Sequence, residues 1–214
     1  MSASRVTLKL ATSLDGRIAT ASGESRWITG PAARDEVHRL RSEHDGVLVG
    51  IETALADDPE LTVRLPDYAG QQPSRVVLDT DQRLVGKLVS TARVVPTLLV
   101  TSAAPRSELI NAGVKVLQIK GRTRHPLLGD VLEALKAEGI LSVFVEGGGQ
   151  VAASFLRAGL VDRLEWFRAP MVLGADGKPA LGQLGLGKLS EAQRFRRLDV
   201  RQVGDDLWER YERI

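Results

Sequence analysis

The chain has 214 residues, of which 43% are hydrophobic and 26% are charged, and its formal net charge is +2 at pH 7. These values are those of an ordinary globular protein with a sizeable core, and they do not require a nucleic-acid partner. Cysteine is absent, which excludes disulfides, thiolate nucleophiles and cysteine-bound zinc.

The N-terminal sequence has no apolar run long enough for a signal peptide, because Lys9 interrupts the best one. No segment approaches the roughly 18 apolar residues of a membrane span. We therefore expect a cytoplasmic protein without a membrane partner.

Apolar runs and helical periodicity alternate along the chain. The first strand is predicted at 6–11, and a helix follows at 31–43. A strand at 46–50 comes next, and then a short helix from Glu52 that ends before Pro59. Further strands are predicted at 75–79, 97–101, 114–119, 141–145 and 164–168, with helices at 126–138 and after the glycines of 147–149.

The last part of the chain has a different character. Residues 174–188 carry five glycines and predict an irregular loop, and the residues around Gly204-Asp205 alternate like an antiparallel hairpin. Strands that alternate with helices predict an α/β fold with a mostly parallel central sheet and helices on both faces. We expect a single domain over residues 1–214.

Ligands of such sheets bind outside the carboxyl ends of the strands. One such end lies in the segment VFVEGGGQVAASFL (143–156), where Gly147, Gly149 and Ala152 fit the dinucleotide fingerprint G-x-G-x-x-A. A purely structural turn explains the glycines equally well. A Rossmann domain fits poorly, because too few residues follow Gly149 and the expected ribose-binding acid about 20 residues on is missing. Glu146 is either a ligand contact beside this turn or a solvated acid.

Several other polar residues have both a functional and an ordinary explanation. Trp27, in GESRWITG, is either a peripheral cover of the core or a planar wall for a ligand ring. The sequence Asp-Asp-Pro at 57–59 ends a helix without any chemistry in the ordinary case. Arg41 is by default a solvated helix residue, but Arg41, Arg64 and Lys9 could converge on a phosphate. Each charge-assisted contact there is worth about 1.5–3 kcal/mol.

Two classes of site are not indicated. His38, His44 and His125 show no metal-ligand spacing with partner acids, so we expect no metal site. The arginines of 194–201 fit a solvated strand edge, and without interleaved exposed aromatics they do not indicate a nucleic-acid surface.

Six segments appear in one order: LKLATSLDGRIA, SGESRWITG, VGIETALADDPELTVR, RVVLDT, VEGGGQVAASFLRAGLVD and APMVLG. Together they closely resemble the reductase domain of the riboflavin-biosynthesis deaminase/reductase family, over nearly the whole chain. The resemblance implies a dihydrofolate-reductase-like fold, a homodimer, and NADPH-dependent reduction of 5-amino-6-(5-phosphoribosylamino)uracil to its ribitylamino form. A zinc deaminase of this family needs P-C-x-x-C ligands, which are absent, so we expect a stand-alone reductase and a separate deaminase as a candidate partner.

The resemblance also implies roles for individual residues. Substrate contacts are implied for Ser25, Arg41, Leu61, Arg64 and Glu146, with the arginines towards the phosphate. NADPH contacts are implied for Ala11, Trp27, Thr53, Asp57, Thr80, Gly148, Gly149, Gln150, Val151, Ala152, Ala153 and Ser154. Gly147 is then interpreted as the turn itself.

The implied reaction opens the sugar and delivers hydride to ribose C1′, which requires proton transfers. Asp57 and Glu146 are the candidates for proton handling or for stabilising a cationic iminium, and Lys9 is a candidate for holding the opening sugar oxygen. Three alternatives stay open: the undeaminated diamino-pyrimidinone as substrate, a pterin or other heterocycle as substrate, and a nucleotide-binding module without activity.

Overall fold

The structure is a computed structural model that describes residues 4–119 and 124–214. Residue contacts divide the chain into two compact units. The first contains Met1–Arg5 and His38–Gly147, and the second contains Val6–Val37 and Gly148–Ile214. The chain therefore crosses from one unit to the other three times, and the last crossing lies inside the glycine-rich segment.

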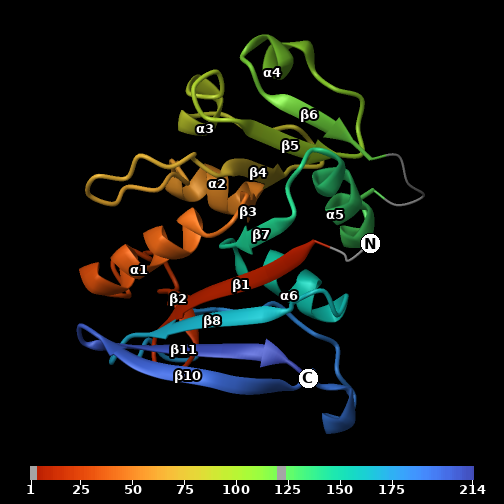
Figure 1. The fold of residues 1–214 in the computed structure, drawn as a ribbon. Coiled ribbons are helices and arrows are strands. Elements are labelled where there is room, and N and C mark those ends of the chain that lie inside the picture. The colour runs from red at the N-terminus through yellow and green to blue at the C-terminus, as the bar shows by residue number, and fades with distance from the viewer. Residues whose placement is uncertain (1–3, 120–123) are drawn as a thin grey trace. The chain divides into compact units, whose positions relative to one another are not determined.

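Five parallel strands make up the sheet of the first unit. They are rich in valine and leucine, and all residues of β3 and β5 are buried, as is typical of strands covered on both faces. The strand order is β7-β3-β4-β5-β6, and every pairing in it is parallel (Figure 1). The strands are β3 (Gly46–Gly50), β4 (Ser74–Leu78), β5 (Thr97–Thr101), β6 (Lys115–Gln118) and β7 (Ser142–Val145).

Helices occupy the connections between these strands, because parallel neighbours cannot be joined by a tight turn. They are α2 (Ile51–Asp57), α3 (Lys87–Ser90), α4 (Ser107–Asn111) and α5 (Leu128–Ala137). Helix α5 buries Val131, Leu132 and Leu135 at helical spacing. The end of α1 (Pro31–Ser42), from His38 onward, also belongs to the first unit.

Four strands make up the main sheet of the second unit, in the order β10-β11-β8-β1. The pairing of β1 with β8 is parallel, and the other two pairings are antiparallel. The turn between β10 and β11 contains Gly204, whose φ of 64° lies in the left-handed region that glycine adopts without strain. The strands are β1 (Arg5–Thr12), β8 (Arg163–Arg168), β10 (Phe195–Val203) and β11 (Asp206–Arg213).

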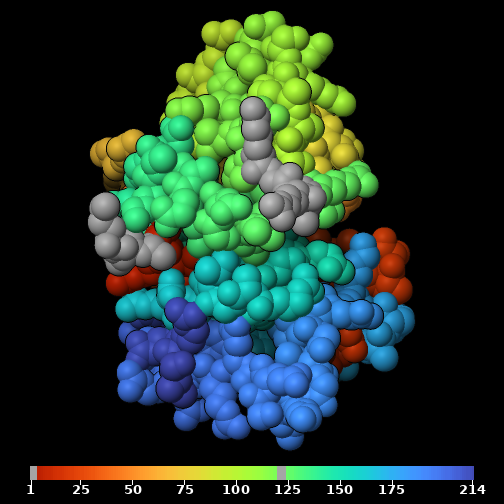
Figure 2. Space-filling view, turned by 90° about the vertical axis from the view of Figure 1, so that its right-hand side faces the viewer, coloured from red at the N-terminus to blue at the C-terminus, as the bar shows by residue number. Residues whose placement is uncertain are grey.

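Helix α6 (Gly149–Arg157) packs into the second unit through Ala152, Ala153, Phe155 and Leu156. The chain after about residue 180, coloured blue in Figure 2, lies beside this helix. Main-chain and side-chain bonds fix that contact, including the Gly182 N–H donating to the Gly149 carbonyl at 2.8 Å. Strand β9 (Lys178–Pro179) lies just before this segment and pairs with β2 (Arg17–Ala19).

The predicted fold class is confirmed: α/β, mostly parallel, with a C-terminal antiparallel hairpin. The irregular loop predicted at 174–188 is interrupted by β9, which the sequence analysis missed. It also missed β2, α3, α4 and the short 3-10 turn η1 (Leu189–Glu191), because elements of two to five residues contain too little periodicity. The single domain over 1–214 stays a prediction.

Candidate active site

The carboxyl edge of the first unit's sheet gathers several predicted site residues. Strands β7, β3 and β4 are neighbours and run parallel, so their carboxyl ends lie at one edge of the sheet. Glu146 directly follows β7, and its N–H donates to the Leu48 carbonyl of β3 at 3.0 Å. Helix α2, with Thr53 and Asp57, directly follows β3, and Thr80 comes two residues after β4. This is the edge at which ligands bind in sheets of this kind.

Glu146 and Arg41 form a nearly buried ion pair within this unit. Arg41 Nε lies 2.5 Å from Glu146 Oε1, and Nη2 lies 2.9 Å from Oε2. The two side chains are only 10% and 8% exposed. Burial opposes the charge of Arg41, but the carboxylate outweighs it, so the pKa of Arg41 is raised. The default interpretation of Arg41 as a solvated helix residue is therefore wrong.

The remaining guanidinium nitrogen of Arg41, Nη1, contacts the segment 58–65, which is neither helix nor strand. Arg41 Nη1 donates to the Thr62 carbonyl at 2.8 Å. All three nitrogens of the guanidinium thus have protein acceptors. The assignment of Arg41 to the substrate phosphate stays a prediction.

The segment contains two non-glycine residues with left-handed backbone. Asp58 has φ 41° and Leu61 has φ 54°, and residues held there cost about 1–3 kcal/mol each. Leu61 is only 3% exposed, so its side chain belongs to the core. The two neighbouring acids differ. The Asp58 side chain accepts the Lys87 N–H at 2.8 Å, whereas the Asp57 side chain is exposed and has no hydrogen-bond partner in the part of the chain that the structure describes.

Arg64 projects from the end of this segment with 54% of its side chain exposed, and its one ion pair in the described ranges is with Glu60, at 3.2 Å. Its main-chain N–H donates to His38 Nδ1 at 3.2 Å. This contact was not predicted, because His38 was considered only as a candidate metal ligand. The available signal was that His38 and Arg41 are three residues apart on one helix face.

Thr53 and Asp57 are four residues apart on α2 and therefore share a face of that helix. Thr80 is half-buried, and its hydroxyl lies 2.9 Å from His125 Nδ1. The implied contacts of these three residues to NADPH stay predictions.

The glycine turn separates two different requirements for glycine. A Cβ on Gly147 would lie 2.7 Å from the Cα of Val49, so any side chain at this position would clash with the main chain of β3. The left-handed backbone is at Gly148, with φ 76° and ψ 136°. The turn conformation is thus at Gly148, whereas our interpretation had put it at Gly147.

The beginning of α6 fits the pyrophosphate of a dinucleotide. The first N–H groups of a helix have no intrahelical acceptor and lie at its positive end. Gly148 and Gly149 add no side chain there, and Gln150 is exposed. In contrast, Ala152 and Ala153 are 3% and 0% exposed, and the Ser154 hydroxyl donates to the Gln150 carbonyl. The first turn therefore fits the anion better than the rest of the predicted stretch 148–154.

The remaining predicted residues lie in the second unit. Lys9 and Ala11 are two apart on β1 and so point to one face of the sheet, opposite Glu165 and Phe167 of β8 in the register. Ser25 is half-buried. Trp27 is 68% exposed, and the guanidinium carbon of Arg34 lies 4.0 Å from its ring centroid.

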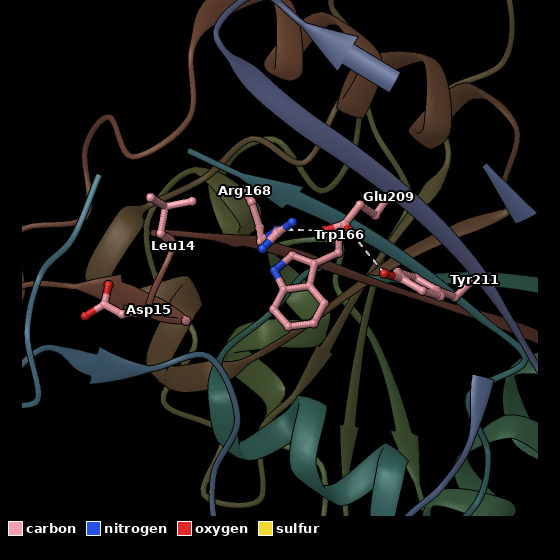
Figure 3. A pocket seen from close by; sticks show the side chains of 7 residues that line it. Leu14, Asp15, Trp166, Arg168, Glu209 and Tyr211 are labelled. Carbon is pink, nitrogen blue, oxygen red and sulfur yellow. Dashed lines mark hydrogen bonds and ion pairs between the residues drawn. The ribbon is translucent and has the colours of Figure 1, made fainter. Parts of the chain in front are cut away.

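The second unit also has a cavity of ≈430 Å³ that the sequence analysis did not predict. Arg168 and Tyr211 both contact Glu209 there: Arg168 Nε is 2.7 Å from Oε2, and the tyrosine hydroxyl donates to Oε1 at 3.0 Å (Figure 3). Burial, followed by the Glu209 carboxylate, raises the pKa of Tyr211. The lining residues are Leu14, Asp15, Gly16, Trp166, Arg168, Glu209 and Tyr211.

Within residues 4–119 and 124–214, no group of three or more His, Asp or Glu side chains could hold a metal ion. In the same ranges, every helix is too short or too polar to cross a membrane.

Comparisons with known proteins agree with this architecture. The sequence model described as "RibD C-terminal domain" matches residues 4–208. The riboflavin biosynthesis protein RibD of Bacillus amyloliquefaciens is 39% identical over 209 residues, covering 94% of this chain and 55% of that protein. The solved structure of RibD from Acinetobacter baumannii is 34% identical with a TM-score of 0.87, covering 99% of this chain and 58% of that one.

A solved structure from Thermotoga maritima bears the name diaminohydroxyphosphoribosylaminopyrimidine deaminase/5-amino-6-(5-phosphoribosylamino)uracil reductase. It is 28% identical with a TM-score of 0.83, covering 99% of this chain and 57% of that one. The chain thus spans somewhat more than half the length of these three relatives. Because the family match extends over nearly all of its residues, this chain belongs to the RibD C-terminal domain family.

Proposed function

We propose that this chain is an NADPH-dependent reductase of riboflavin biosynthesis. It would convert 5-amino-6-(5-phosphoribosylamino)uracil into 5-amino-6-(5-phosphoribitylamino)uracil. The observation that carries the proposal is the Glu146 carboxylate, held by Arg41 at the carboxyl edge of the first unit's sheet and directly followed by the glycine turn. The name of the Thermotoga maritima relative, which includes this uracil reductase activity, supports the choice of substrate.

The reaction reduces the sugar carbon C1′. When the C1′–O4′ bond breaks, O4′ leaves with the electron pair and gains a proton while the nitrogen loses its proton, which gives an open-chain imine. Addition of a hydride to C1′ and a proton to nitrogen then gives the ribitylamine. NADPH supplies the hydride when it is bound. The first turn of α6 would hold its pyrophosphate, and Trp27 would stack against one of its rings.

The two acids would have different tasks in this reaction. Arg41 donates to both oxygens of Glu146, and an adjacent cation favours the ionised carboxylate. Glu146 is therefore suited to stabilising the cationic form of the imine. The Asp57 carboxylate is exposed and has no hydrogen-bond partner among the described residues, so it is suited to moving the proton. Lys9 would hold the released sugar oxygen.

Arg64 would bind the substrate phosphate. Its side chain is half exposed and has only an exposed acid as an ion-pair partner in the described ranges, whereas the donors of Arg41 are already engaged. Arg64→Ala should raise KM for the phosphorylated substrate about tenfold, the loss expected for one charge-assisted contact. An unchanged KM would exclude this role.

The experiment that tests the function follows absorbance at 340 nm with NADPH and either the deaminated or the undeaminated pyrimidine phosphate. Steady loss with the deaminated compound supports the proposal. Faster loss with the undeaminated compound reassigns the substrate, and no loss with either indicates a binding module. Asp57→Asn and Glu146→Gln should lower turnover about 10²-fold or more while NADPH still binds. The matched control Asp58→Asn keeps an acceptor oxygen for the Lys87 N–H and should retain turnover.

We also propose that the chain forms a homodimer through the edge of its C-terminal hairpin. Strand β10 lies at the end of the strand order, where it leaves main-chain groups unpaired. Leu198 and Val200 on this strand are 45% and 43% exposed. Light scattering that gives twice the chain mass, and the single-chain mass for Val200→Lys, would support this interface; an unaltered dimer would exclude it.

A further inference from the structure

Side chains hold the main chain of the segment 60–64, which carries Leu61 and Arg64. The segment forms no helix or strand. The Glu60 carbonyl accepts from Arg75 Nη1 at 3.4 Å, and the Thr62 carbonyl accepts from Arg41 Nη1 at 2.8 Å. Gln72 bonds to both the N–H and the carbonyl of Val63, at 2.7 and 3.1 Å. The direction in which the Arg64 side chain leaves the segment therefore depends on these side chains.

His38 makes the contact at Arg64 itself. It is 9% exposed and lies one helical turn before Arg41 on α1. Its Nδ1 lies 3.2 Å from the Arg64 main-chain nitrogen and 3.1 Å from the Thr62 carbonyl oxygen. One ring nitrogen cannot both accept from the N–H and donate to the carbonyl, because it either carries a proton or does not.

The other hydrogen bonds of Thr62 and Arg64 indicate which of the two contacts forms. The Thr62 carbonyl already accepts a hydrogen bond from Arg41. The Arg64 N–H has no other acceptor in the part of the chain that the structure describes, and the bond to His38 is partly buried, so losing it would leave this donor without a protein partner. The favoured arrangement therefore has an unprotonated Nδ1 that accepts from Arg64, with the ring proton on Nε2.

We infer that His38 is a positioning residue, which orients Arg64 towards the substrate phosphate by accepting its main-chain N–H. This inference rests on the proposed function. In the described ranges, His38 makes no hydrogen bond to the side chains of Glu146, Asp57 or Arg64, and it acts through the main chain of Arg64.

The surroundings of His38 favour the neutral ring that this role requires. Burial lowers its pKa, the charges of Arg41 and Arg64 lower it further, and the Thr62 carbonyl and the Glu146 carboxylate act in the opposite direction. A protonated Nδ1 would face the Arg64 N–H with a second donor. At neutral pH the ring is therefore an acceptor at this position.

Two substitutions separate this role from simple packing. Asparagine places an acceptor oxygen close to the position of Nδ1, whereas leucine fills the space without one. His38→Leu should raise KM for the phosphorylated pyrimidine about tenfold, as loss of Arg64 would, and leave kcat within about twofold and NADPH affinity unchanged. His38→Asn should restore a near-normal KM.

His44→Leu is the matched control. His44 is a partly buried histidine whose Nδ1 lies 2.6 Å from the Leu40 carbonyl, and it packs against Phe144. It makes no hydrogen bond to residues 60–64 in the described ranges. This substitution should lower stability and leave KM unchanged. A raised KM in His44→Leu equal to that in His38→Leu would show a nonspecific packing effect and overturn the inference.

Amide hydrogen exchange gives a readout that does not depend on activity. The Arg64 amide of the wild-type protein should be protected, should exchange at least tenfold faster in His38→Leu, and should be protected again in His38→Asn. If the wild type oxidises no NADPH while exchange behaves in this way, the proposed function fails and the contact stands. Equal exchange in all three proteins, or a KM in His38→Asn as high as in His38→Leu, would overturn the inference.

Discussion

The contribution of the buried Arg41–Glu146 ion pair to stability can be predicted quantitatively. Removing one partner of a buried pair leaves an uncompensated charge and costs about 3–5 kcal/mol, whereas replacing both partners with apolar residues can be close to neutral. We therefore expect Arg41→Met and Glu146→Leu each to lower the free energy of unfolding by about 3–5 kcal/mol. In a chain of this length each loss lowers Tm by roughly 6–20 °C.

The double variant should lose much less than the sum of the two single variants. The expected coupling energy is at least about 3 kcal/mol, measured in a double-mutant cycle by urea unfolding followed by circular dichroism. The matched control is the Arg64–Glu60 pair, which is 3.2 Å long and about half exposed on both sides. The same substitutions at that pair should give a coupling energy of about 0.2–1 kcal/mol. A coupling energy below about 1 kcal/mol for Arg41–Glu146 would refute the buried ion pair.

Three further predictions concern other parts of the molecule. The Asp15 carboxylate accepts hydrogen bonds from the Ser13 hydroxyl and from main-chain N–H groups, which lower its pKa to about 2. The ionised carboxylate therefore stabilises the folded state above about pH 4, and this contribution is lost as the pH falls towards 2. The Tm gap between wild type and Asp15→Asn should close over that range, and a constant gap would contradict this. Gly148→Ala should cost about 1–3 kcal/mol from its positive φ, and Gly147→Ala should cost more, because its Cβ would meet main chain; equal urea midpoints for wild type and Gly147→Ala would contradict the close approach. Trp27→Ala should change the free energy of unfolding by less than about 0.5 kcal/mol but raise the Kd of NADPH about three- to tenfold through lost stacking, as measured by NADPH fluorescence titration.

The sequence was sufficient to predict the elements that have a local periodicity or consist of an unbroken run of buried residues. Residues 46–50 and 97–101 were predicted with their observed bounds, because each is an apolar run that parallel neighbours cover on both sides. Short elements depend on distant partners instead. Helix α3, for example, begins where the Lys87 N–H meets the Asp58 carboxylate, 29 residues away in sequence. No local periodicity contains that information.

The candidate site divides in the same way. Glu146 was recognisable because a strand end before a glycine turn is a local pattern. Its partner was not, because Arg41 lies 105 residues away and helix periodicity alone favours a solvated arginine. The two adjacent glycines raise a different difficulty. Gly147 is required because a side chain would clash, and Gly148 is required because its φ is positive. The sequence shows glycine at both positions and therefore could not distinguish these two reasons.

The strained backbone of the segment 58–65 is held in place by the residues packed around it. Left-handed backbone at Asp58 and Leu61 persists only where the surroundings over-determine it. Here the surroundings are the buried Leu61 side chain and hydrogen bonds from α1, β4 and Gln72. Because α1 contacts both this segment and Glu146, one helix would hold two parts of the proposed substrate site together. Substitution of His38 should therefore alter substrate affinity, and substitution of Arg41 should alter turnover.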